Sequence, residues 1–357
     1  MGRGSAILRN DCKGETMSKL KLGYIGAGNV VRGMHLPGVA MLPDKFEVAA
    51  FCDIDKAKAE GLAETVGAQA FGSVREMTAA IPDLDLVTVA TRPPNAHMTP
   101  AIEALEAGVN VFVEKPFAAS LSDAQRGFDA ARQAGKTLCA YQNRRYEIAF
   151  LSFMQALGEG VVGKPGIIVR HQNCGVKSDD FLDFGAHIFD QIVCMIGDRG
   201  IVEVSGAVQQ PAMKFDVGEF GWYRAEIRCD DGLVAIAEKL PYPAQKSYFY
   251  AAGDKGMIQQ DWCDSKNDLL RKTFKRMGDT VPPAWCPDFL NDTHPGFHAG
   301  PDATLYYRCY DRMHEHIVNA APTPVAPRDT LRAFALMEAM MESALQGRAV
   351  VFDEPMP

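Results

Sequence analysis

The sequence predicts an α/β protein, with a doubly wound parallel sheet in its first part and a second domain whose sheet is mostly antiparallel. Three observations predict this. Between residues 20 and 141, short apolar segments alternate with helical segments, which is typical of a parallel sheet with helices on both faces. After residue 200, strand-like segments follow one another, which favours antiparallel pairing. The length of 357 residues suits about two domains.

The composition excludes several classes of protein. A net charge of −8 without a dense Lys/Arg stripe argues against a nucleic-acid surface. No apolar run approaches the ~20 residues that cross a bilayer, so no membrane association is expected. The nine cysteines form no C-x-x-C pair, and several lie within apolar runs. This usage favours reduced core cysteines in the cytoplasm over a disulfide framework or a metal site.

The first domain is expected to span residues 19–142. Residues 1–18 are polar and aperiodic, and we interpret them as a disordered leader outside the fold. The predicted strands are 20–25, 46–52, 69–71, 84–90, 109–113 and 137–141, and the predicted helices are 57–66, 74–80, 99–107 and 122–134. Glycines close three of these helices, at Gly67, Gly108 and Gly135, where the left-handed conformation is common.

A glycine loop follows the first strand as Gly26-Ala27-Gly28-Asn29-Val30-Val31. It matches the start of G-x-G-x-x-G, the dinucleotide-binding pattern. The first glycine makes the tight turn, and the second lets a pyrophosphate approach the backbone at the N-terminus of the next helix. Val31 stands where the pattern has a third small residue, so the packing of helix against strand should differ there.

Asp53 ends the second strand, 25 residues after Gly28. An acid at this place is expected on the ribose hydroxyls of NAD, and its charge repels the 2′-phosphate of NADP. NAD is therefore favoured, although Lys56 and Lys58 follow closely. Alternatively, Asp53 is the N-cap of the helix that begins near Lys56.

The strand at 109–113 runs into Glu114, Lys115 and Pro116. In open α/β sheets, ligands bind just outside the carboxyl ends of the strands. A lysine there has three donors, and Pro116 biases it toward extended geometry. Whether the Lys115–Pro116 bond is cis or trans is left open. A surface Glu-Lys pair is the alternative.

The second domain is expected to span residues 143–357. Its predicted helices are 147–158, 181–197, 305–320 and 330–345, and its predicted strands are 167–173, 202–208, 223–229, 233–240, 247–251 and 349–352. In the helix 181–197, Asp183, His187 and Asp190 recur at i, i+4 and i+7 and form one polar stripe. Such a stripe on a buried helix is either a satisfied structural cluster or the face of an active site. Residues 262–300 are irregular, and their role is left open.

Taken together, six motifs resemble those of the Gfo/Idh/MocA oxidoreductases, from about residue 20 to residue 352. They are Gly26-Ala27-Gly28, Pro93-Pro94-Asn95-Ala96-His97, Glu114-Lys115-Pro116, Asn143-Arg144-Arg145-Tyr146, the run from Asp183 to Asp190, and the run from Ser343 to Val350. The resemblance implies an N-terminal Rossmann domain, followed by an α/β domain with a large open sheet that binds substrate and pairs subunits into a homodimer or homotetramer.

The resemblance also implies chemistry. It implies hydride transfer at a secondary alcohol carbon of a sugar, polyol or glycoside, with NAD, or less readily NADP, as cofactor. Lys115, Asp183 and His187 match the catalytic positions. Imidazole can take a hydroxyl proton near neutrality, so we expect His187 to be the base and Lys115 to stabilise the reacting oxygen, although these two could exchange roles. Asp183 would bind substrate or tune His187.

The residues expected at the cofactor lie along the loops of the first domain and at the domain junction. They are Gly26, Gly28, Asn29, Val30, Asp53, Thr91, Arg92, Pro93, Asn95, His97, Glu114, Lys115, Asn143 and Arg145. Arg92 stands where the family usually has Thr, and it either reaches the cofactor phosphates or faces solvent.

Two other functions remain open. Some relatives in the family resemble NAD-dependent glycosidases, in which a transient oxidation permits elimination without net cofactor turnover. A non-catalytic NAD-binding regulator is the third reading, since fold alone does not fix function. The set of Lys115, Asp183 and His187 argues against a regulator, because a binding module needs no acid/base groups.

Overall fold

The computed structural model describes most of the chain. The described residues are 19–92, 96–173, 181–209, 222–240, 248–260, 275–276, 279–280 and 301–356. The predicted disorder of the leader 1–18, the predicted roles of Pro93 and Asn95, and most of the segment 262–300 lie outside them.

The first sheet has six parallel strands, as predicted. They are β1(Leu20–Ile25), β2(Phe46–Cys52), β3(Gln69–Phe71), β4(Leu86–Val89), β5(Asn110–Val113) and β6(Leu138–Ala140), in the order β3-β2-β1-β4-β5-β6. This is the doubly wound dinucleotide-binding order, which reverses between β1 and β4. All side chains of β4 and β6 are buried, which explains their apolar sequence. The carboxyl ends of the strands share one edge.

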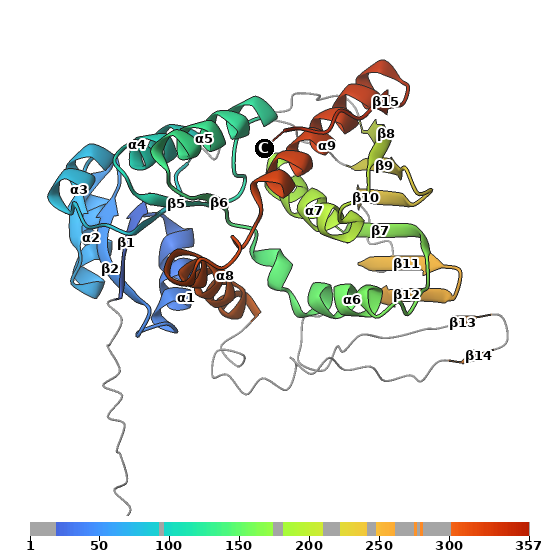
Figure 1. The fold of residues 1–357 in the computed structure, drawn as a ribbon. Helices are drawn as coiled ribbons and strands as arrows, with labels where there is room; N and C mark the ends of the chain where they lie inside the picture. The colour runs from blue at the N-terminus through green and yellow to red at the C-terminus, as the bar shows by residue number, and fades with distance from the viewer. Residues whose placement is uncertain are drawn as a thin grey trace, which may run out of the picture.

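Helices cover both faces of this sheet (Figure 1). They are the π-helical turn η1(Val31–His35), α1(Leu36–Ala40), α2(Lys56–Val66), α3(Val74–Ala80), α4(Met98–Glu106) and α5(Leu121–Ala134). Val31 is fully buried at the start of the widened turn η1. The predicted irregularity at this third position therefore falls where the helix departs from α geometry.

A helix from the C-terminal part of the chain also packs on the first sheet. α8(Pro301–Asn319) lies beside α1 (Figure 1). The Lys45 ammonium donates to Asp311 at 2.7 Å and to Glu315 at 2.6 Å on this helix. The division of the chain at residue 142 stays a prediction, and the sequence pattern did not indicate that α8 returns to the first sheet.

The second sheet has seven strands in the order β12-β11-β7-β10-β9-β8-β15. These are β7(Pro165–Asn173), β8(Ile201–Val208), β9(Tyr223–Cys229), β10(Val234–Leu240), β11(Phe249–Gly253), β12(Gly256–Gln260) and β15(Val350–Val351). β7 and β10 run parallel and the other neighbours run antiparallel, which confirms a mostly antiparallel sheet. β12 was not predicted, because its polar Gln259 and Gln260 obscure the strand pattern. A short pair, β13(Lys275–Arg276) and β14(Asp279–Thr280), adds strands to a segment expected to be irregular.

Three helices line one face of the second sheet (Figure 1). They are α6(Ile148–Gly158), α7(Phe181–Ile196) and α9(Pro327–Gln346). Gly206 in β8 permits the close approach of α9, because a Cβ there would lie 2.0 Å from the carbonyl oxygen of Met340. The 3-10 helix η3(Asn143–Tyr146) leads from β6 toward this layer. Among the described helices, none combines the length and apolar character needed to cross a membrane.

Candidate functional site

The predicted site residues follow the carboxyl ends of five strands of the first sheet, and Asp53 follows β2. The glycine loop follows β1, Thr91 follows β4, Glu114 and Lys115 follow β5, and Asn143 follows β6. Since these ends share one edge, the loops face a common region. α7 brings Asp183 and His187 to the same region, through the contacts described below.

The two glycines of the loop differ in what surrounds them. Gly26 has φ +98°, and a Cβ there would lie 2.4 Å from the carbonyl oxygen of Ala90. A Cβ on Gly28 would meet nothing within 4 Å, and Gly28 and Asn29 are exposed. Val30 precedes η1, and no side chain caps the start of that turn. Gly26 is therefore required by the fold, whereas Gly28 leaves open space beside a helix start that no side chain caps, which suits an anion.

Asp53 is tied to the glycine loop. Its carboxylate accepts from the Ala27 amide at 2.8 Å and from the Asp55 amide at 2.9 Å. The N-cap of α2 is Asp55, so the alternative reading of Asp53 as the cap was wrong. A carboxylate has about four acceptor sites, so these two bonds leave capacity for ribose hydroxyls.

His97 joins two loops of this edge. Its ring nitrogens lie 2.9 Å from the carbonyl oxygen of Pro116 and 3.0 Å from that of Thr91. The ring is buried, and burial lowers the pKa of His97 below its ordinary value. His97 therefore fixes the loop after β4 against the turn at Pro116, which is preceded by a cis peptide bond. Arg92 is exposed, and its reach to cofactor phosphates stays a prediction.

Glu114 points into the fold. Its carboxylate lies 3.0 Å from His35 Nε2, and it accepts from the Tyr306 hydroxyl at 3.4 Å. Burial opposes the charged form, but the contact with His35 and the charge of Lys115 outweigh it and hold the pKa of Glu114 below its usual value. The described contacts of this side chain are internal, and a direct role at the cofactor stays a prediction.

Lys115 and Asp183 form a direct pair, and His187 lies near enough on α7 for the lysine charge to act on its imidazole. The Lys115 ammonium pairs directly with the Asp183 carboxylate, and both side chains are partly exposed. His187 lies one turn further along α7 and is buried. Burial lowers the pKa of His187 well below its ordinary value, and the positive charges of Arg144, Lys115 and Arg170 lower it further. The imidazole is therefore neutral at neutral pH and can accept a proton.

Positive charge surrounds this turn of α7. The Arg144 guanidinium carbon lies 5.8 Å from the ring centroid of Phe184, and Lys239 Nζ lies 5.5 Å from it. Phe184 is the neighbour of Asp183 in the chain. Such a field favours negative charge that develops on a reacting oxygen.

Asp190, the third member of the polar stripe, belongs to a structural cluster. It forms a two-bond pair with the Arg145 guanidinium, at 2.8 and 2.7 Å, and Asp329 on α9 lies 3.1 Å from the same guanidinium. Both members of the pair are buried to a large extent. The three polar residues of this stripe therefore differ in their surroundings: Asp183 and His187 lie at the candidate site, and Asp190 lies in the core. The predicted contact of Arg145 with the cofactor stays a prediction.

Several buried polar atoms of this region have no hydrogen-bond partner among the described residues. They are Thr91 Oγ1, Gln142 Oε1, Asn143 Oδ1 and His187 Nδ1. Buried polar groups are normally satisfied, so these atoms fit a polar ligand at the edge. A nicotinamide carboxamide and ribose carry matching groups, and Gly28 leaves room for a pyrophosphate. The residues present therefore fit NAD.

Sequence reasoning missed Gln142 and His35. Gln142 is buried, and its amide nitrogen donates to the carbonyl oxygen of Ala186, next to His187, at 3.4 Å. A glutamine after a strand gives no local signal of such a contact. His35 gave none either, because a lone histidine in an apolar helix does not reveal its partners.

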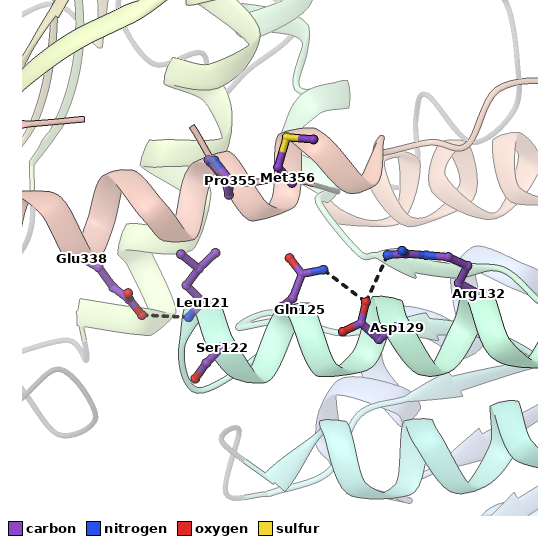
Figure 2. A pocket seen from close by; sticks show the side chains of 8 residues that line it. All are labelled: Leu121, Ser122, Gln125, Asp129, Arg132, Glu338, Pro355 and Met356. Carbon is purple, nitrogen blue, oxygen red and sulfur yellow. Dashed lines mark hydrogen bonds and ion pairs between the residues drawn. The ribbon is translucent and has the colours of Figure 1, made fainter. Parts of the chain in front are cut away.

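An open groove lies elsewhere on the molecule, between α5, α9 and the C-terminal residues (Figure 2). It has a volume of about 550 Å³ and is lined by Leu121, Ser122, Gln125, Asp129, Arg132, Glu338, Pro355 and Met356. Glu338 accepts from the Leu121 amide at 2.8 Å across it. None of the predicted site residues lines this groove. The candidate site is therefore defined by the convergence of side chains at the sheet edge.

The two glycines predict separable effects of substitution. Gly28→Ala should leave thermal unfolding unchanged, because its Cβ meets open space, yet lower the affinity for NADH about tenfold or more, a loss of ~1.4 kcal/mol for each factor of ten. Titration of NADH by fluorescence and a thermal scan measure both. Gly33→Ala is the matched control, since its Cβ also meets nothing within 4 Å but lies beyond the loop. Unchanged NADH affinity in Gly28→Ala would contradict the site.

Comparisons with known proteins agree with this geometry. Residues 20–142 match the model of an oxidoreductase family with an NAD-binding Rossmann fold. The chain is 27% identical to the uncharacterized oxidoreductase YhhX of Escherichia coli over 344 residues, which cover 90% of this chain and 96% of that one. It is 28% identical to D-glucoside 3-dehydrogenase of the same organism, over 62% of this chain and 68% of that one.

The fold is also found among solved structures. The WlbA dehydrogenase from Bordetella pertussis, crystallised with NADH and UDP-GlcNAcA, aligns with a TM-score of 0.76 at 19% identity. The alignment covers 96% of this chain and 99% of that chain. At this identity the likeness shows a shared fold.

Proposed function

We propose that the chain belongs to the Gfo/Idh/MocA oxidoreductase family, whose NAD-binding model matches residues 20–142, and that it is an NAD-dependent dehydrogenase or reductase acting at a secondary alcohol carbon of a sugar, polyol or glycoside. The observation that carries this proposal is the meeting of Lys115, Asp183 and a neutral, buried His187 beside the unpartnered polar atoms of the sheet edge. The relatives include D-glucoside 3-dehydrogenase and an inositol 2-dehydrogenase, which supports the substrate class.

Three side chains have separate roles in the proposed reaction. NAD, when bound, supplies the hydride acceptor or donor. His187 takes the hydroxyl proton, so that the carbinol oxygen becomes a carbonyl oxygen. The Lys115 ammonium donates a hydrogen bond to that oxygen and stabilises its developing negative charge. Asp183 holds the ammonium in place until a substrate hydroxyl joins it.

The cofactor would be held by the loops at the same edge. The amides at the start of η1 and the space beside Gly28 suit the pyrophosphate. Asp53 would accept from the ribose hydroxyls, which favours NAD over NADP. Thr91, Gln142 and Asn143 offer buried polar atoms to the nicotinamide side.

The low pKa of His187 predicts the pH dependence. Burial and three cations keep the imidazole neutral in the folded enzyme well below its ordinary pKa of 6.5. The acid limb of kcat/KM should therefore lie below pH 6.5, and the rate should be flat from there to neutrality. An acid limb at or above pH 6.5 would contradict His187 as the base. The same shift predicts lower stability below that pH, because the unfolded chain then binds a proton that the folded chain excludes.

We also propose that the protein is a cytoplasmic homo-oligomer. α6, α7 and α9 cover one face of the second sheet, and no described helix covers the other (Figure 1). That other face carries the half-buried apolar side chains of Ile167, Val169 and Val234, which a second copy of the chain would cover. Sedimentation of the purified protein decides between monomer, dimer and tetramer.

The function is tested with a substrate panel. Purified protein is incubated with NAD+ or NADP+ and with sugars, polyols and glycosides, while nicotinamide absorbance and product mass are followed together. We expect net reduction of NAD+ with one alcohol and little with NADP+. Glycoside cleavage without net absorbance change would instead identify a redox-assisted hydrolase. Tight binding of NAD+ without turnover across the panel would indicate a regulator.

A further inference from the structure

A buried polar cluster lies beneath Lys115, between η1, the first sheet and α8. His35 Nδ1 lies 2.9 Å from the Tyr310 hydroxyl, which lies 2.9 Å from the Thr88 hydroxyl. On its other side, His35 Nε2 lies 3.0 Å from the Glu114 carboxylate. His35, Thr88 and Tyr310 are each 0% exposed. An oxygen atom therefore lies within 3.0 Å of each ring nitrogen of His35, and the one beside Nε2 is the Glu114 carboxylate.

The Glu114 carboxylate, which lies against His35, also contacts the main chain of Lys115. One carboxylate oxygen faces His35 and Tyr306, and the other accepts from the amide of Lys115 at 2.8 Å. The amide of Glu114 itself donates to the carbonyl oxygen of Val89 at 2.8 Å, the last rung of the parallel ladder. Side chain and main chain together therefore fix the backbone from which Lys115 projects.

The carboxylate depends on His35 for this position. Glu114 is only 4% exposed, and a buried charge is costly unless it is paired. Among the described residues, the Tyr306 hydroxyl contacts the same carboxylate oxygen as His35 but at the longer distance of 3.4 Å, so the imidazole is the closer neighbour of that oxygen. Removing His35 would leave a buried charge free to move toward other donors, and Lys115 would follow through its amide.

We propose that His35 is a positioning residue for Lys115: it holds the Glu114 carboxylate, which in turn holds the main chain of the lysine. His35 lies on η1, the turn that follows the glycine loop. The cluster thus connects the element that begins at the cofactor loop with the ammonium that faces Asp183. This inference rests on the proposed function, in which Lys115 acts on the reacting oxygen.

The test compares three variants of the full-length protein. His35→Leu removes both ring nitrogens, His35→Gln keeps a donor for Glu114, and His314→Leu is the matched control. His314 is a buried histidine of α8 whose ring lies 5.6 Å from Phe46, and no described contact joins it to Glu114. The readouts are the affinity for NADH, the rate at which succinimidyl acetate labels Lys115 in peptide mass spectra, and kcat with the alcohol found in the panel.

In His35→Leu we expect kcat to fall about 10²-fold, the effect of a misplacement near 1 Å, with KM for NAD+ unchanged. Lys115 should be labelled several-fold faster, because it leaves Asp183, while other lysines keep their rates. His35→Gln should recover most of kcat, and His314→Leu should match the wild type. If His35→Leu does not fold, Glu114→Gln carries the same expectations.

Normal kcat and normal labelling of Lys115 in His35→Leu would overturn the inference. Equal losses in His35→Gln or His314→Leu would also overturn it, because they would indicate a general packing defect. Full turnover in Lys115→Met would instead overturn the proposed function, whatever the His35 variants show. The two failures are therefore distinguishable.

Discussion

Replacing Lys115 with Met is expected to lower kcat by about 10²–10⁴-fold, the usual contribution of a positioned proton donor or acceptor. Lys115 supplies the ammonium that pairs with Asp183 and adds to the positive charge around His187. Methionine keeps the length and apolar character of the side chain but offers no donor to a developing alkoxide. Steady-state turnover with the alcohol found in the substrate panel measures the loss.

The same variant should remain folded and bind NADH within a few-fold of wild type. The Lys115 side chain is 28% exposed, so little packing is lost. Lys136→Met is the matched control, since Lys136 is exposed and follows the C-terminal end of α5. A Lys115→Met variant with wild-type kcat would remove the lysine from the chemistry. If NADH binding is lost as well, the effect lies in cofactor binding and not in the reacting oxygen.

Asp190→Ala is expected to destabilise the protein by about 3–5 kcal/mol, the cost of removing one member of a buried ion pair. The carboxylate is 2% exposed, and it makes both bonds of a two-bond pair with Arg145, at 2.8 and 2.7 Å. Burial raises the pKa of Asp190, while Arg145 opposes that rise. Equilibrium unfolding in urea, monitored by circular dichroism, measures the change.

Two further variants separate this pair from general effects. Asp129→Ala breaks an exposed pair with Arg132 and should change stability by about 0.5 kcal/mol or less. Combining Arg145→Met with Asp190→Leu should restore much of the loss, because it removes both charges and keeps apolar volume. A loss below about 1 kcal/mol in Asp190→Ala would mean that the pair is not buried in solution.

Much of the fold could be predicted because its signals are local. Alternating apolar strands and helices fix a parallel sheet, and the glycine loop after β1 gives its first turn, where Gly26 takes a positive φ. The alternation along β9, with Tyr223, Ala225 and Ile227 buried, gives an antiparallel sheet with one covered face. These patterns depend only on neighbours in the chain.

Other features depend on contacts between residues that are distant in sequence, and no local sequence pattern predicted them. α8 joins the first sheet through pairs such as Lys45 with Asp311, which are 266 residues apart. Asp183, His187 and Asp190 form one stripe in the sequence, but their partners differ. Only the structure separates the Lys115 contact of Asp183 from the Arg145 contact of Asp190.

The candidate site shows the same limit. The sequence could place Lys115 at a strand end, where a side chain meets ligand. It could not reveal that the side chain of the neighbouring Glu114 points into the protein interior, toward His35. At the end of a strand, a side chain can point either to the ligand site or to the interior. Nor could it reveal which polar atoms stay unpartnered, such as Asn143 Oδ1, because satisfaction depends on every surrounding group.

The central claim is that this site moves a hydride between a carbinol carbon and NAD, with Lys115 and His187 acting on the oxygen. The most direct measurement uses an alcohol from the panel that carries deuterium on the reacting carbon. The reduced nicotinamide is then isolated and weighed by mass spectrometry. We predict one deuterium in the nicotinamide ring with wild-type protein and almost none with Lys115→Met or His187→Leu. Product formed without deuterium in the nicotinamide, or equal transfer in both variants, would contradict the account.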